Sequence, residues 1–145
     1  MNIALISPSN TEFSETFIQA HRNGFVGNVH FLTGGKIPVH SDKVGVLKLS
    51  FVDRIVNFCL GRITKDILRA DRVAFKKYLI KHDIQVVYAE YGGTGATVVE
   101  MCKECDIPLI VNFHGRDAFA FDELKENERA YQLLIRDAKA IVVVV

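Results

Sequence analysis

Short, uninterrupted apolar runs alternate along the chain with longer segments in which apolar residues recur at helical spacing. Uninterrupted runs of this length are typical of strands that are buried on both faces of a parallel sheet. We expect strong strands at 2–6, 29–32, 86–89, 109–112 and 140–145, and a weaker one at 44–49. The remaining segments predict helices at about 14–23, 51–82, 96–105 and 122–137, with a break near Gly61 and loops at 36–43 and 118–121.

This order of elements predicts an α/β fold, a Rossmann-like doubly wound parallel sheet whose halves meet between the first strand and the strand at 86–89. A chain of 145 residues, 49% of them hydrophobic and 24% charged, fits one domain of ordinary globular composition. In such a sheet, ligands bind beyond the carboxyl ends of the strands at this switch point. We therefore expect a site between the loops at 7–14 and 90–95, where helix N-termini favour an anionic ligand.

The charge balance and the apolar runs restrict the partners and the location of the protein. A formal net charge of +1 argues against a dedicated nucleic-acid-binding protein, so no nucleic-acid partner is expected. No apolar run approaches the roughly 20 residues of a transmembrane helix, and the N-terminus does not have the form of a secretory signal. The three cysteines lack a disulfide-like spacing, which favours a reducing compartment such as the cytoplasm.

A glycine-rich turn follows the strand at 86–89 and allows two interpretations. Gly93, Thr94 and Gly95 resemble the start of a dinucleotide-binding fingerprint, but the third glycine is absent and the segment does not follow the first strand. The alternative is a tight strand-to-helix turn that needs glycine for its backbone angles. We prefer this second interpretation, and we expect no nicotinamide or flavin cofactor.

Cys102 and Cys105 form a CxxC pair, which is compatible with a redox site or with half of a zinc site. The second pair of ligands that such a zinc site requires is absent, so helix packing is the preferred interpretation and no metal is expected. Four of the five histidines form no pattern that indicates a site, and we expect them at the surface or in the core. They are His21, His30, His40 and His82.

The sequence His114-Gly115-Arg116-Asp117 directly follows the strand predicted at 109–112. In a functional interpretation, the imidazole donates to a ligand hydroxyl or oxyanion, Gly115 allows a close approach, and the Arg116 fork binds a carboxylate or phosphate. Asp117 then orients one of these groups or binds a sugar hydroxyl. The alternative is a structural histidine at the strand end, since the rim of any such sheet is partly polar. We favour the functional interpretation.

Basic residues gather along the helix predicted at 51–82. Apolar residues at 63, 67, 70, 74 and 78 recur at helical spacing and define one face. Another face carries Arg62, Lys65, Arg69, Arg72 and Lys76, and Phe51, Ile55, Phe58 and Leu60 lie alongside. Such a basic stripe is either a solvated face or a surface for peripheral attachment to an anionic membrane.

Four segments carry a resemblance to a known family. They are Ser14-Glu15-Thr16-Phe17-Ile18, then Tyr88-Ala89-Glu90-Tyr91-Gly92, then 107–111 with the His114-Gly115-Arg116-Asp117 sequence, and finally 138–142. Together, and in this order over nearly the whole chain, they resemble the N-terminal domain of glycosyltransferase family 4. The form with Ser-Glu-Thr-Phe is similar to bacterial enzymes that build exopolysaccharide, capsule or lipopolysaccharide sugars.

The resemblance implies that the chain is the N-terminal, acceptor-binding half of a GT-B fold. Enzymes of this family are retaining transferases that need no metal and take a sugar from a nucleotide diphosphate sugar as co-substrate. The implied acceptor is a glycan or a lipid-linked sugar. His114 would be catalytic, because it would contact the transferred sugar. The implied substrate-binding residues are Ser14, Glu15, Glu90, Gly92, Gly93, Gly95, Gly115, Arg116 and Asp117.

A basic helix that touches the membrane also occurs in this family, which would make Arg62, Lys65, Arg69, Arg72 and Lys76 membrane-facing on the cytoplasmic side. Two features depart from the family pattern. The segment 10–13 replaces a glycine pair found in many members, so we expect no backbone cradle for a diphosphate there. The chain also ends at Val145, before the donor-binding domain. We therefore expect a truncated transferase that is inactive alone, and the alternative is a stand-alone Rossmann-like binding module without catalysis.

Overall fold

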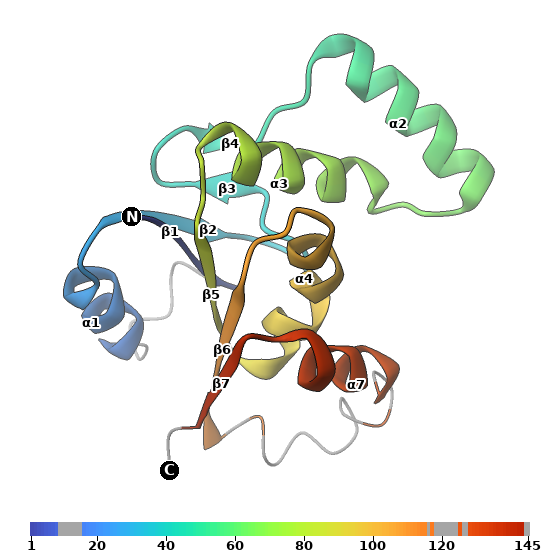
Figure 1. The fold of residues 1–145 in the computed structure, drawn as a ribbon. Coiled ribbons are helices and arrows are strands. Elements are labelled where there is room, and N and C mark those ends of the chain that lie inside the picture. The colour runs from blue at the N-terminus through green and yellow to red at the C-terminus, as the bar shows by residue number, and fades with distance from the viewer. Residues whose placement is uncertain (9–15, 116, 118–124, 126–127, 144–145) are drawn as a thin grey trace.

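One sheet of seven strands runs through the described part of the chain. The computed structural model describes residues 1–8, 16–115, 117, 125 and 128–143, and its sheet has the order β4-β3-β2-β1-β5-β6-β7 (Figure 1). The strands are β1 (Asn2–Ser7), β2 (Asn28–Thr33), β3 (His40–Ser41), β4 (Gly45–Val46), β5 (Val86–Glu90), β6 (Leu109–Phe113) and β7 (Ala140–Val143). The five strands β2, β1, β5, β6 and β7, which are neighbours in this order, are parallel. β3 pairs antiparallel with both β2 and β4. The predicted α/β class with a mostly parallel sheet is confirmed.

β1 shows how an uninterrupted apolar run becomes a central strand. Ala4 and Ile6 belong to the larger core cluster on one face of the sheet, and Leu5 belongs to a smaller cluster on the other face. All three side chains are fully buried, since successive residues of a strand point to opposite faces. β1 pairs in parallel with both β2 and β5. The two halves of the sheet therefore meet between β1 and β5, as the sequence predicts.

Helices cover both faces of this sheet. α1 (Thr16–Gly24) lies on one face, while α3 (Arg69–Lys81), α4 (Gly92–Glu104) and α7 (Glu128–Asp137) lie on the other (Figure 1). α2 (Phe51–Thr64) packs mainly on α3 and forms an outer element, at the top of the view in Figure 1. This arrangement is compatible with a Rossmann-like fold.

The predictions of a strand at 44–49 and of a loop at 36–43 are both wrong in detail. The structure has two short antiparallel strands instead, β3 and β4, which pair through His40 with Val46 and through Ser41 with Gly45. A further parallel strand requires a crossover of about a dozen residues or more. The segment 34–39 between β2 and β3 is too short for one, so the chain turns back at the edge of the sheet.

The helix predicted at 51–82 is broken, but not at Gly61. α2 continues through Gly61 to Thr64, and Lys65, which follows it, takes a left-handed conformation with φ 57°. An added Cβ at Gly61 would lie 2.8 Å from the Asp66 carbonyl oxygen, so glycine here lets the chain fold back on itself. α4 also begins earlier than predicted, at Gly92. The segment predicted as linker at 118–121 and most of 122–127 lie outside the described residues.

Candidate functional site

The carboxyl ends of β5 and β6 bring the predicted polar residues together beside the switch point. Glu90 ends β5 and is in register with Asn112 of β6, and His114 follows β6 directly. α1 lies across these strands on the face opposite to α3, α4 and α7, and it contributes Phe17 and His21 to the site. Ser14, Glu15 and Arg116 lie outside the described residues, so their predicted roles stay predictions.

Glu90 is the centre of this site, because its buried carboxylate contacts three nitrogen atoms. Its Oε1 lies 2.6 Å from Nδ1 of His21, and its Oε2 lies 3.0 Å from Nε2 of His114. The Asn112 side-chain amide donates to the same Oε2 over 3.0 Å. Glu90 is fully buried, and a buried carboxylate is stable only when donors of this kind surround it. Glu90 therefore acts on its neighbours rather than touching a ligand directly.

His114 is held in one orientation by polar and aromatic neighbours. Its ring packs against Phe17 at 4.2 Å and against Tyr91 at 4.8 Å between ring centroids. Its Nε2 lies 3.0 Å from Oε2 of Glu90 and 3.1 Å from the side-chain nitrogen of Asn112, so these two groups orient the imidazole. The side chain retains 14% of its exposure, so an edge of the ring reaches the surface at the sheet rim.

Asp117 closes the turn that carries His114. Its Oδ1 accepts from the Gly92 amide over 3.0 Å, and its Oδ2 accepts from the His114 amide over 2.8 Å. The negative charge also suits the N-terminus of α4, where unpaired amides concentrate. We expected this helix N-terminus to face an anionic ligand, but the protein's own carboxylate binds its first amide. Asp117 thus orients the backbone of His114.

The glycines of the turn at β5 serve packing more than ligand approach. A Cβ added at Gly92 would lie 2.5 Å from the Phe113 ring, and one at Gly95 would lie 2.6 Å from Val111. Both positions therefore let α4 pack closely on β6. Gly93 is different, since its added Cβ would meet only the Tyr131 hydroxyl at 3.7 Å. Gly115 is exposed and has open space around it, which leaves the predicted close approach of a ligand sterically free.

Tyr91 lies in the loop at 90–95 where the sequence predicts a site, but no sequence signal indicated its unusual backbone. It joins β5 to α4 with φ 74° and ψ 143°, a backbone conformation that residues other than glycine rarely adopt. Such strain costs on the order of 1–3 kcal/mol and tends to occur at functional sites. The backbone is held there because the Tyr91 amide donates to the Asn112 carbonyl over 2.9 Å. The strained turn places the Tyr91 ring beside His114.

His21 is the second residue that the sequence analysis missed. It follows Phe17 by one helical turn, and its ring stacks on Phe25 and meets the edge of Tyr88. This i, i+4 spacing was the available signal, but it does not show which strand the helix faces.

Burial, together with the neighbouring Glu90 carboxylate, raises the pKa of Tyr88 to about 12. Tyr88 therefore remains neutral and contributes packing.

Asn112 adds an unsatisfied acceptor to the cluster. Its side chain is fully buried, and its Oδ1 has no hydrogen-bond partner within the part of the chain that the structure describes. Buried polar atoms without partners are uncommon and call for a water or a ligand group. A hydroxyl is the simplest group that satisfies such an acceptor, because it brings one donor and little bulk.

The CxxC pair has the character of helix packing. Cys102 is buried in the core, and this burial raises the pKa of its thiol far above the usual range. Burial also raises the pKa of Cys105. A neutral, buried thiol is a poor nucleophile and a poor metal ligand. Among the described residues, no group of three or more histidines, cysteines and carboxylates has an arrangement that could hold a metal ion.

The basic stripe does not form one helical face, and this part of the sequence interpretation is wrong. Arg62 and Lys65 belong to α2 and its C-terminus, whereas the other three basic residues, Arg69, Arg72 and Lys76, belong to α3. Arg72 pairs with Asp66 and Lys76 pairs with Glu104. The α3 part of the stripe borders a pocket of about 280 Å³ that also contains Asp66, Glu100 and Glu104. Arg72 and Lys76 are therefore paired with acids of the protein, and Arg69 lines the same pocket.

A search against models of known protein families gave no match for this chain, and a search of curated protein sequences also gave none. The functional conclusion therefore depends on the residues and the geometry described above.

Proposed function

We propose that this chain is the acceptor-binding half of a retaining glycosyltransferase with the GT-B fold, which moves a sugar from a nucleotide diphosphate sugar to a glycan or glycolipid acceptor. The observation that carries the proposal is the buried Glu90 carboxylate, which fixes His114 at the carboxyl end of β6 beside the switch point. The family resemblance of the segments around these two residues supports the same conclusion. A donor-binding domain elsewhere in the full-length enzyme would hold the nucleotide.

In this proposal, His114 contacts the sugar that is transferred, and Glu90 with His21 keeps the imidazole in place. A second domain closes over the rim and excludes water, so that acceptor, donor sugar and His114 are aligned before reaction. Alignment of this kind, with stabilisation of the leaving diphosphate, accounts for most of the rate in such transfers.

The test is a His114→Ala substitution in the full-length transferase. Loss of one preorganised donor at a reacting centre typically costs about 10²–10³-fold in turnover. We expect a loss of this size, with little change in the affinity for the nucleotide sugar. His40→Ala is the matched control, because His40 is exposed on β3 near the edge of the sheet, away from Glu90. Unchanged turnover in the His114 variant would remove the catalytic assignment.

Ligand binding by the 145-residue chain itself provides an independent measurement. Saturation-transfer NMR with a panel of acceptor glycans should detect weak binding, and amide shifts should change near His114 and Gly115. Binding that changes amides only on other parts of the sheet would contradict the placement of the acceptor. Specific glycan binding by a full-length protein that transfers no sugar would favour a binding module instead.

A further inference from the structure

α3 and α4 lie side by side on the same face of the sheet, and each presents a stripe of polar residues to a pocket of about 280 Å³ (Figure 1). The lining residues recur at spacings of three and four, which places them on one side of each helix. From α3 and the residue position 66 before it they are Asp66, Arg69, Arg72, Val73 and Lys76, and from α4 they are Thr97, Glu100, Met101 and Glu104.

Two ion pairs border this pocket and leave one cation unpaired. Arg72 lies 3.2 Å from Asp66, and Lys76 lies 2.5 Å from Glu104. Asp66 precedes α3 and Lys76 lies in the second half of α3, so the two pairs are at opposite ends of the pocket. Arg69 lines the pocket between them, and its side chain has no acidic partner within the described residues.

Two buried donors in this pocket have no acceptor. The Nε atoms of Arg69 and Arg72 are both buried, and neither finds a hydrogen-bond partner in the part of the chain that the structure describes. The ion pair of Arg72 uses a terminal nitrogen of its guanidinium, so its Nε remains available. Buried polar atoms without partners are uncommon and call for a water or a ligand group. An acceptor is therefore missing where both arginines line the pocket.

The guanidinium geometry and the charge balance together define the chemistry of that acceptor. The planar fork of an arginine matches the oxygen atoms of a carboxylate or a phosphate. The pocket contains three cations and three acids, so its summed charge is zero and it does not favour a multiply charged anion such as phosphate. Val73 and Met101 add an apolar surface to the lining. These features favour an anion with a single charge and an apolar part.

We propose that the pocket between α3 and α4 binds a small monocarboxylate with a short apolar body. The carboxylate accepts hydrogen bonds from Nε of Arg69 and Nε of Arg72, and the apolar body lies against Val73 and Met101. Ordinary ligand pockets have volumes of about 300–1,000 Å³. A pocket at the lower end of this range fits a small metabolite and excludes a nucleotide or an oligosaccharide.

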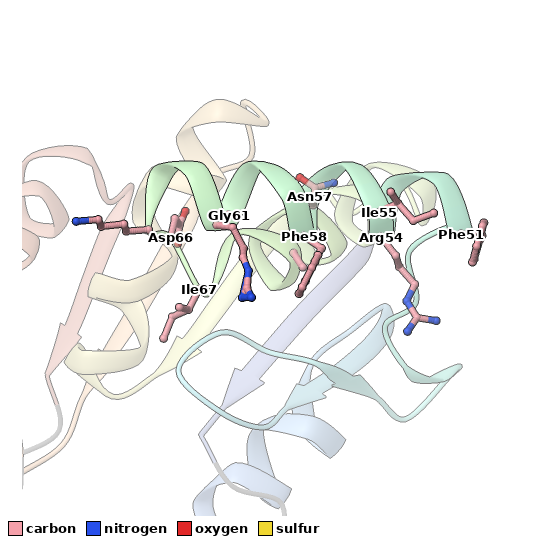
Figure 2. Close-up of a pocket in the computed structure, with 11 residues that line it drawn as sticks. Phe51, Arg54, Ile55, Asn57, Phe58, Gly61, Asp66 and Ile67 are labelled. Carbon is pink, nitrogen blue, oxygen red and sulfur yellow. The ribbon is translucent and has the colours of Figure 1, made fainter.

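This pocket is separate from the apolar groove of about 900 Å³ on α2. Figure 2 shows Phe51 and Arg54 towards one end of that groove and Asp66 and Ile67 towards the other. Asp66 lines both cavities, whereas Arg54 lines the groove and not the pocket. No helix within the described residues, α2 included, is long and apolar enough to span a membrane. Arg54 therefore provides a matched control for Arg69.

The proposal does not depend on the glycosyltransferase function. His114 lies beside the N-terminal end of α4, where Asp117 accepts from the Gly92 amide. Glu100 and Glu104 of the pocket lie in the second half of the same helix. A monocarboxylate in the pocket is thus a second ligand and not part of the acceptor site.

NMR with the isotope-labelled 145-residue chain tests the proposal, because arginine Nε–H groups give their own signals in nitrogen-proton correlation spectra. The probe is isovalerate, a short branched carboxylate. We expect saturable, millimolar binding that shifts the Nε–H signals of Arg69 and Arg72, while those of Arg54 and Arg62 stay unchanged. The alcohol with the same carbon skeleton tests whether the carboxylate is required, and inorganic phosphate tests whether a single charge is preferred. Both should bind much more weakly.

An arginine-to-lysine substitution then separates the guanidinium fork from its charge. Arg69→Lys keeps the positive charge but removes Nε–H, and it should weaken isovalerate binding about tenfold. Arg54→Lys should leave the dissociation constant unchanged. Circular dichroism should show the same fold for both variants.

Four results would overturn the proposal. If isovalerate shifts neither Nε–H signal, water satisfies the two donors and the pocket is not a ligand site. Equal shifts with the alcohol would show apolar partitioning without a role for the carboxylate. Equal or tighter binding of phosphate would contradict the assignment to a monocarboxylate. Unchanged affinity in Arg69→Lys would exclude Arg69 as the group that recognises the ligand.

Discussion

Replacement of Glu90 by leucine should destabilise the protein strongly, although leucine is close in size and apolar. The buried carboxylate is the shared partner of three nitrogen atoms, on His21, Asn112 and His114. Leucine would remove the acceptor that all three share, although they differ in how far water can reach them. The prediction therefore concerns the neighbours of Glu90 more than the lost side chain.

The magnitude follows from the exposure of each neighbour. A buried polar group that loses its partner costs about 1–3 kcal/mol. Asn112 is fully buried and His114 nearly so, whereas His21 keeps 32% of its side-chain exposure and can turn to water. Two full penalties and one partial penalty suggest about 3–5 kcal/mol, which matches the usual cost of removing one partner from a buried charged pair. A domain of ordinary stability, about 5–15 kcal/mol, remains folded after such a loss.

The assay is urea unfolding of three variants, followed by circular dichroism. Glu90→Gln keeps an acceptor and the shape of the side chain, and a histidine can change its tautomer to match the amide, so we expect about 1–2 kcal/mol. Glu100→Leu is the control at an exposed position of α4 and should change the stability by less than about 0.5 kcal/mol. A cost below about 1 kcal/mol for Glu90→Leu would refute the interpretation of Glu90 as the organising group.

Two further predictions concern the backbone and the pH. Gly61→Val should lower the free energy of unfolding by about 1–3 kcal/mol, because the valine Cβ meets the Asp66 carbonyl oxygen. Gly115→Val is the control and should be nearly neutral, because nothing lies near its added Cβ. Equal urea midpoints for the two variants would contradict this prediction. Burial, with His82 and Lys43 nearby, lowers the pKa of His30 from 6.5, so the unfolded chain binds this proton at a higher pH than the folded protein. Stability should fall as the pH drops below about 6.5, and His30→Gln should flatten that slope; parallel pH profiles for the two proteins would exclude His30 as the cause.

The parallel strands could be predicted from the sequence because burial on both faces leaves an uninterrupted apolar run. β1, β5 and β6 all have such runs, and their ends then indicated Glu90 and His114 as candidates. The short edge strands could not be predicted in this way. β3 and β4 have two residues each, and their pairing depends on a turn that apolar periodicity does not describe.

The site itself was only partly predictable, because its partners come from separate elements. His114 and Asp117 are close in the sequence, but the contact of Asp117 with Gly92 joins residues 25 positions apart. His21 meets Glu90 only because α1 crosses the sheet at one particular angle, and no local pattern encodes that angle. The strain at Tyr91 is likewise imposed by the contacts on both sides of the turn, and not by its own preference.

α2 shows a different limit of sequence interpretation. Helical periodicity divides a segment into faces but does not say which face is inside. The apolar series that was expected to form one helical face is in fact divided, with Ala74 and Tyr78 of α3 in the core and Ile63 and Ile67 exposed. The left-handed turn at Lys65 separates the two halves, and with it α2 turns Asn57 inward.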